Sequence, residues 1–218
     1  MPIDHKKKIL AAGAVLAAGA MGGASLMGTS SAQQSDRATT AHTHAELAPL
    51  NNSGVFGESD VHVVDRKIDV TLSANHLLKG LPHAAHIHFG AKAKNECPTV
   101  RDDDNHDHRL NTAEGIPQYG PVKVSLTTRG DTSAKSTLAV NRFDAAKNGD
   151  IDYSRAGIEV SKSVARGIRR GEAVVVIHGI DYNKNGTYDF SAGRSELDPS
   201  LPAEATDPVS CGVLKVVE

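Results

Sequence analysis

The chain has 218 residues, a length that suits one sizeable domain with an additional segment. Its formal net charge is −2, it has no tryptophan, and only 4% of its residues are aromatic. This composition excludes a strongly basic protein that holds nucleic acid or an anionic membrane, and it offers no stacking surfaces for bases or sugars.

Residues 1–32 have the layout of a secretory signal peptide. Lys6, Lys7 and Lys8 form a positive start, residues 9–27 are apolar, and residues 30–32 (SSA) supply small side chains for cleavage. A membrane anchor is the alternative, but the apolar stretch is short and rich in Gly and Ala for a span. We therefore expect a secreted or extracytoplasmic protein whose mature chain has no stable membrane span. Cleavage would remove three Lys and one Asp and change the formal charge from −2 to −4.

Residues 33–52 are polar and show no sustained period, so we expect a flexible tail. Alternating apolar residues then predict a β domain over residues 53–218. One short helix is expected after Ser161, which can cap it, with Gly171 at its end. Many short strands with one small helix predict an all-β sandwich in which two long loops, residues 91–120 and 179–209, are functional or tied down. The expected strands cover residues 61–64, 68–72, 84–89, 122–126, 137–140, 173–178 and 211–217.

The segment HAAHIHFG places three histidines within six residues. His86 and His88 would point to one face of a strand, with Cα atoms roughly 6.5–7 Å apart. His178 ends the most apolar predicted strand and is the natural third member of a metal site, because imidazole suits copper, zinc, iron and nickel. The alternative is that His86 and His88 are hydrogen-bonded structural histidines.

The two cysteines, Cys97 and Cys211, would meet oxidising conditions after secretion. An even count there favours a disulfide. The bridge would close a loop of more than 110 residues, which the chain-entropy model makes worth about 4–5 kcal/mol. Two free buried thiols are the alternative.

Three motifs in this order resemble the Cu/Zn superoxide dismutase family: LPHAAHIHFG (residues 81–90) with Cys97 nine residues after His88, VVVIHG around His178, and CGVL at Cys211. HAAHIHFG also resembles CHRD domains, a related β-sandwich group with no settled chemistry. The resemblance implies a Greek-key β-sandwich and copper bound by His86, His88 and His178. It also implies that His83 is a structural histidine below the site and that a Cys97–Cys211 bridge pins the metal-bearing loop.

The chain departs from that family pattern at two points. His106 and His108 are the possible fourth copper ligands, but they follow Cys97 by nine and eleven residues, later than the pattern requires. The zinc ligands of the family have no counterparts, so no zinc site is expected. The family's anion-guiding arginine is replaced by Pro208, and Arg194 in the same long loop is the candidate substitute.

Two acidic loops match the spacing of EF-hand calcium loops. The second lacks a carboxylate at position twelve, which is Ala192, unless Glu196 folds back. In the first loop, position six is His108, where the template has glycine. The template requires a left-handed backbone at this position, which suits histidine poorly. Acidic, Asn-rich turns without an ion are the alternative for both loops. The calcium ligands would be Asp103, Asn105, Asp107 and Glu114 in the first loop, and Asp181, Asn183, Asn185 and Asp189 in the second.

These patterns favour a secreted, calcium-stabilised binding module with a copper site over an efficient enzyme, because the fourth ligand and the arginine are missing. A copper-dependent superoxide dismutase is the alternative, and copper storage or delivery is a third hypothesis. The sequence shows no nucleophile with a base partner and no Gly-rich phosphate-binding loop, so it disfavours hydrolase and nucleotide-dependent functions. Metal ions are the only partners that the sequence indicates.

Overall fold

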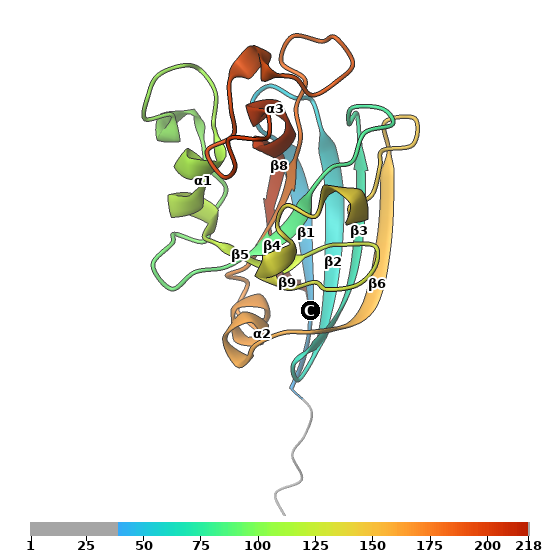
Figure 1. Ribbon diagram of the computed structural model, residues 1–218. Helices are drawn as coiled ribbons and strands as arrows, with labels where there is room; N and C mark the ends of the chain where they lie inside the picture. Colours follow the sequence, from blue (N-terminus) through green and yellow to red (C-terminus); the bar gives the residue numbers. More distant parts are fainter. Residues whose placement is uncertain (1–38, 218) are drawn as a thin grey trace, which may run out of the picture. The chain divides into compact units, whose positions relative to one another are not determined.

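Antiparallel β-strands make up most of the regular secondary structure in the computed structural model, which describes residues 39–217 (Figure 1). The expected signal peptide, residues 1–32, lies outside the described residues. None of the helices described is long and apolar enough to cross a membrane. The strands are β1 (Thr40–Pro49), β2 (Phe56–Val64), β3 (Lys67–Asn75), β4 (Ala85–His88), β5 (Val122–Ser125), β6 (Ile151–Glu159), β7 (Val174–His178), β8 (Pro208–Val213) and β9 (Lys215–Val217). The helices are α1 (Thr112–Tyr119), α2 (Lys162–Arg169) and α3 (Ala203–Thr206), with short 3-10 turns η1 (Val100–Asp102), η2 (Ala134–Ser136), η3 (Val140–Arg142) and η4 (Phe190–Ala192).

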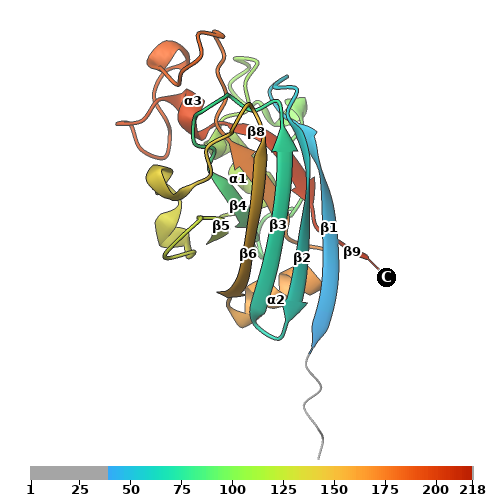
Figure 2. The ribbon, with the colours of Figure 1, turned by 90° about the vertical axis from the view of Figure 1, so that its right-hand side faces the viewer.

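The strands form one curled antiparallel sheet in the order β5-β4-β7-β8-β1-β2-β3-β6, and β9 pairs with β1. Strand β1 joins the two halves of this sheet, because residues 40–47 pair with β2 and residues 48 and 49 pair with β8. In Figure 2, β6, β3, β2 and β1 run side by side in front of β4, β5 and β8. The expected all-β class is confirmed, while a Greek-key sandwich stays a prediction.

The main core lies between the two halves of the curled sheet. Strand β3 alternates strictly between exposed and buried residues, so Ile68, Val70 and Leu72 face inward from one half. Ile87 and Ile177 face the same core from the other half. Strands β4 and β7 are buried on both faces, because the long loops and their helices cover the outer face of this half.

The outer face of β7 holds a second, smaller cluster. Val174 and Val176 alternate with the core residues of β7 and pack there with Leu110, Tyr119 and Cys211. Cys211 forms a disulfide with Cys97, as predicted, and the alternative of two free thiols is wrong. The bridge fastens the loop after β4 to β8, on the face of the sheet where His178 also lies.

Two expectations about strands are wrong. The flexible tail expected over residues 33–52 contains β1, because Thr43, Ala45 and Leu47 alternate into the core and every second residue between them faces away. Since only one of these three is large and apolar, the pattern was weak. The strand expected over residues 137–140 is instead the connection between the 3-10 turns η2 and η3, and of these residues only Val140 belongs to either turn. Arg142 links the two turns, because it donates to Ser136 Oγ at 2.7 Å. Strand β6 was not predicted.

The helix expected after Ser161 is confirmed as α2, since Ser161 Oγ accepts from the amide of Val164 at 3.2 Å. Gly171 follows the helix with a φ of +70°. The expectation of a single helix is wrong, because α1 and α3 lie in the two long loops. α1 begins at a reciprocal cap in which Asn111 Oδ1 accepts from the amide of Glu114 and Glu114 Oε2 accepts from the amide of Asn111, both at 3.0 Å.

Candidate metal centre

Three histidines meet on the outer face of the β4–β7 pair. His86 and His88 stand two residues apart on β4, and His178 ends the neighbouring strand β7. The amide of His178 donates to the carbonyl of Ala84 at 2.8 Å, which fixes the end of β7 beside the start of β4. The alternation of both strands then sends all three imidazoles to the face opposite the main core.

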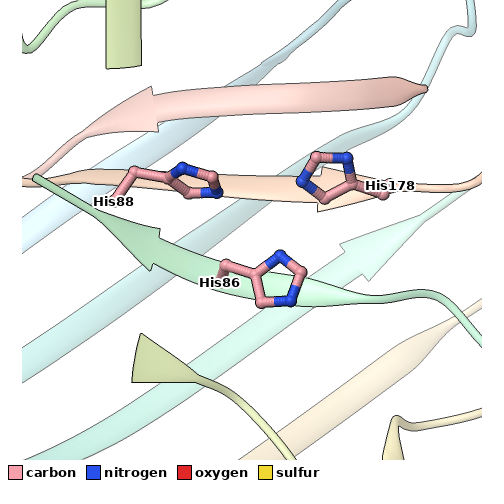
Figure 3. Close-up of side chains that lie close together, drawn as sticks. All are labelled: His86, His88 and His178. Atoms are coloured by element: carbon pink, nitrogen blue, oxygen red, sulfur yellow. The ribbon is translucent and has the colours of Figure 1, made fainter. Parts of the chain in front are cut away.

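The three side chains are almost fully buried, with exposed fractions of 2% for His86, 1% for His88 and 3% for His178. One ligand nitrogen from each lies within 4.8 Å of those of the other two. Figure 3 shows a ring nitrogen of each side chain turned toward the space between them. In the part of the chain that the structure describes, no other set of three His, Cys, Asp or Glu ligand atoms meets this closely.

Each imidazole is anchored by one backbone carbonyl. Nε2 of His86 lies 3.2 Å from the oxygen of Thr137, Nδ1 of His88 lies 2.8 Å from that of Gly120, and Nδ1 of His178 lies 2.6 Å from that of Thr206. A carbonyl oxygen can only accept, so each of these nitrogens must carry the hydrogen and donate. The other nitrogen of each neutral ring therefore holds a free lone pair.

These three remaining nitrogens, His86 Nδ1, His88 Nε2 and His178 Nε2, are buried without a hydrogen-bond partner among the described residues. A buried polar atom without a partner costs free energy, and each one in a folded protein needs an explanation. A shared cation explains all three at once, because metal-bound histidines commonly donate their second nitrogen to a carbonyl or carboxylate.

The site keeps its imidazoles neutral, which metal binding requires. Burial lowers the pKa of His88 to about 3, and the proximity of His178 adds to this effect. Burial likewise lowers the pKa of His178 to about 4. Burial is also the main cause that lowers the pKa of His86 well below 6.5, followed by the charges that His178 and His88 would carry.

His83 is not one of the three clustered histidines, but it contacts the backbone of His178, which is one of them. Its Nδ1 is 3.0 Å from the carbonyl oxygen of His178, and its Nε2 is 3.2 Å from that of Leu78. The hydroxyl of Tyr188 lies 3.2 Å from the same ring. These contacts fit a histidine that positions the end of β7.

The candidates for a fourth ligand do not join the triad. His106 and His108 are exposed in the loop before α1, away from the three buried rings. Arg194 does not reach the site either, since it donates to the carbonyl of Pro199 at 2.6 Å and stacks over Phe190. A metal ion held by three histidines alone would keep a coordination position open.

A cavity of about 280 Å³ borders the three histidines. Its walls come from α1, the start of β5, the turns η2 and η3, and the segment that ends in α3. The lining residues are Ala84, His86, His88, Thr112, Ile116, Pro121, Val122, Ala134, Thr137, Leu138, Val140, His178, Leu197, Leu201, Ala205 and Thr206.

The first of the two acidic loops is held by hydrogen bonds from its own backbone. The amide of Asp107 donates to the side-chain oxygens of Asp103 and Asn105, and the amide of His108 donates to Asp103 Oδ2 at 2.9 Å. His108 adopts the left-handed backbone that the calcium template requires at this position, with a φ of +66°. The side chain of Glu114 accepts from the amides of Asn105 and Asn111.

The second loop repeats this network position by position. The amide of Asn185 donates to the side-chain oxygens of Asp181 and Asn183, and the amide of Gly186 donates to Asp181 Oδ2 at 2.7 Å. Asp189 Oδ2 accepts from the side-chain amides of Asn183 and Asn185. The two loops therefore share one backbone design.

The carboxylate that fastens the second loop is the fully buried Glu204 and not Glu196. Glu204 accepts from the amides of Tyr182 and Asp189 at 3.0 and 2.7 Å, and from the hydroxyl of Ser191 at 2.8 Å. The sequence analysis did not predict Glu204 as part of this loop. It lies fifteen residues beyond Asp189, in the short helix α3, which shows no helical pattern of apolar residues.

No protein-family model matches this chain, and no curated protein matches it. The resemblance to the Cu/Zn superoxide dismutases and CHRD domains therefore stays a prediction from the three sequence motifs.

Proposed function

We propose that this protein is a metal-binding module that holds one copper ion with His86, His88 and His178. The observation that carries the proposal is the set of three buried ring nitrogens whose lone pairs have no partner among the described residues. Copper is the preferred occupant, since nitrogen sites bind Cu²⁺ more tightly than the other divalent first-row metals.

We extend the proposal to the family, a superoxide dismutase-like or CHRD-type domain that acts outside the cytoplasm. The HxxHxH motif ending at His88, the separate His178 and the bridged cysteines support it. A disulfide is compatible with an extracytoplasmic location. The signal peptide remains a prediction, and mass spectrometry of the exported protein would locate the cleavage site that we expect after residue 32.

Copper binding is tested by titrating the metal-free protein with Cu²⁺ and, separately, Zn²⁺ in competition with a chelator. We expect one copper ion per chain, with nitrogen coupling from imidazoles in its electron paramagnetic resonance spectrum. His178→Ala should weaken copper binding at least about 100-fold, since even mutating a residue that only hydrogen-bonds to a metal ligand typically lowers metal affinity by about 10–100-fold. His62→Ala, an exposed histidine on β2, is the matched control. Copper affinity that is unchanged in His178→Ala would overturn the proposal.

A superoxide dismutase is the alternative function, favoured by the coordination position that three ligands leave open. Bound copper would supply one-electron oxidation and reduction, and the protein would hold the ion and limit access to it. Superoxide removal by the copper-loaded protein is the test, beside His178→Ala. Rapid turnover that is lost in the variant would establish the enzyme, whereas turnover no faster than that of free copper would leave a binding module.

We also propose calcium binding in the two acidic loops, supported by the hydrogen-bond network that both share. Glu114→Gln separates this role from a purely structural one, because glutamine can replace glutamate in the helix cap but lacks the charge that a calcium ligand needs. We expect calcium affinity in the first loop to fall at least 10-fold. Stability in calcium-free buffer should fall only slightly, because glutamine can keep the 3.0 Å bond from the amide of Asn111 and loses only the weaker 3.4 Å bond from that of Asn105. Equal calcium affinity in both proteins would exclude Glu114 as a ligand.

A further inference from the structure

The cavity beside the three histidines has apolar walls. Ile116, Leu138, Val140, Leu197 and Leu201 surround it, and none of its lining residues is Asp, Glu, Lys or Arg. The polar residues that line it are the three histidines together with Thr112, Thr137 and Thr206.

The rim of the cavity is formed by apolar side chains that reach solvent. Ile116 on α1, Val140 on η3 and Leu197 in the segment before α3 are exposed by 36%, 44% and 40%. These side chains come from three separate parts of the chain and meet at one opening. Exposed apolar groups gathered around a polar site commonly mark a binding site for an apolar ligand.

Such walls select against a small anion. An anion that enters loses its hydration, and apart from the copper ion itself no lining group carries a positive charge that compensates for this loss. The nearby arginines are engaged elsewhere: Arg194 binds the carbonyl of Pro199, and Arg109 binds Asp107 at 2.7 Å. A neutral apolar group gains free energy in the same space, in proportion to the surface that it buries.

We propose that the cavity binds a small neutral organic molecule with an apolar body and a single donor atom, which occupies the open coordination position of the metal. This inference rests on the proposed copper site and specifies its ligand class. A dry apolar cavity of about 150 Å³ accommodates benzene, so the 280 Å³ here suits a molecule of about a dozen heavy atoms.

The test uses 4-phenylimidazole, a neutral nitrogen donor with an apolar body, beside imidazole and azide. Each probe is titrated into the copper-loaded protein, and its binding is followed by the copper resonance spectrum and by calorimetry. Burial of the phenyl group should make 4-phenylimidazole bind at least about 10-fold more tightly than imidazole. Equal affinities for the two imidazoles, or binding of azide alone, would overturn the proposal.

A charge placed in the rim gives the matched comparison. Val140→Lys introduces an ammonium at the opening, whereas Val100→Lys introduces it at a residue that is 87% exposed and does not line this cavity. We expect Val140→Lys to remove the 10-fold preference for 4-phenylimidazole and to strengthen azide binding, and Val100→Lys to change neither. The same preference in both variants would overturn the assignment of the cavity. Dimers that dissociate only in Val140→Lys would assign the cavity to a second copy of the chain and would also overturn it.

Copper content, measured after each titration, separates this inference from the proposed function. Bound copper without a preference for the phenyl group contradicts the inference alone. If copper is not retained, 4-phenylimidazole is titrated into the metal-free protein and followed by methyl resonances. Saturable shifts of Leu138, Val140 and Leu201 would support apolar binding in the cavity without the copper proposal, and their absence would contradict both.

Discussion

At the scale of single residues, the backbone carbonyls decide what the histidines can do. Thr137, Gly120 and Thr206 each accept from one ring nitrogen, so His86 must present Nδ1 to the site while His88 and His178 present Nε2. The sequence predicted the three histidines from strand alternation. It could not predict which ring nitrogen of each histidine faces the site. That choice depends on backbone carbonyls in the long connecting segments, and no sequence pattern indicates where those carbonyls lie.

We expect the metal-free protein to hold these three rings neutral, with His86 protonated on Nε2 and the other two on Nδ1. Because burial lowers the pKa of His88 to about 3 and that of His178 to about 4, neither ring should titrate between pH 7 and 5.5. Long-range proton–nitrogen correlation spectra measure both properties, with a histidine peptide of pKa about 6.5 as reference. A titration of either ring near that value would contradict the buried arrangement.

A second residue-scale prediction concerns Asp207, which is fully buried behind the site. Burial raises its pKa to about 7, although Tyr182 donates to its Oδ2 at 3.0 Å. Its other oxygen has no partner among the described residues. The unfolded chain loses this proton near pH 3.8 and the folded chain near pH 7, so the carboxyl destabilises the fold increasingly as pH rises through that window.

Asp207→Asn removes the buried charge and should therefore raise the free energy of unfolding at pH 8 but not at pH 4. Urea unfolding at the two values measures the difference. Asp104→Asn, an exposed aspartate in the loop before α1, is the control and should show no such pH dependence. A variant that is less stable than the wild type at pH 8 would show that the ionised carboxylate is needed.

At the scale of elements, strict alternation was sufficient to predict β3, whereas the continuous apolar run in residues 173–178 predicted β7 as a strand buried on both faces. Strand β1 was missed, since its inward positions include Thr43 and Ala45, which resemble a polar tail. Helices α1 and α3 were missed for another reason. α1 contains Pro117 and α3 is one turn long, so neither shows a helical period.

The second acidic loop depends on α3 through Glu204, which leads to an element-scale prediction. In the wild type, the two oxygens of Glu204 accept from the amides of Tyr182 and Asp189. In Glu204→Gln, the side-chain NH₂ group replaces one of these oxygens and faces a backbone donor, so we expect a loss of about 1–3 kcal/mol in stability. Thermal unfolding measures the loss, and faster hydrogen exchange at Tyr182 and Asp189 would place it in the loop. Glu159→Gln on β6 is the exposed control, and equal behaviour of the two variants would contradict this role for Glu204.

At the scale of the whole molecule, the site is a product of long-range contacts. β4 and β7 supply the ligands, while the three carbonyls and the cavity walls come from both long loops and from the segment that contains η2. Residues that line one site are thus separated by up to about half the chain. The strand motifs predicted the ligand set, but the apolar cavity depends on how the loops fold back, which pairwise spacing in the sequence does not specify.

The disulfide is the covalent link between this loop structure and the sheet, so its removal should affect both stability and metal binding. Cys97→Ala combined with Cys211→Ala avoids free thiols that would bind copper themselves. The bridge joins residues 114 positions apart, and we expect its loss to cost about 2–5 kcal/mol in denaturant unfolding. Copper affinity should fall by about 10-fold as well, because the bridged loop carries the Gly120 carbonyl that orients His88. A less stable variant with unchanged copper affinity would show that the sheet alone positions the three histidines.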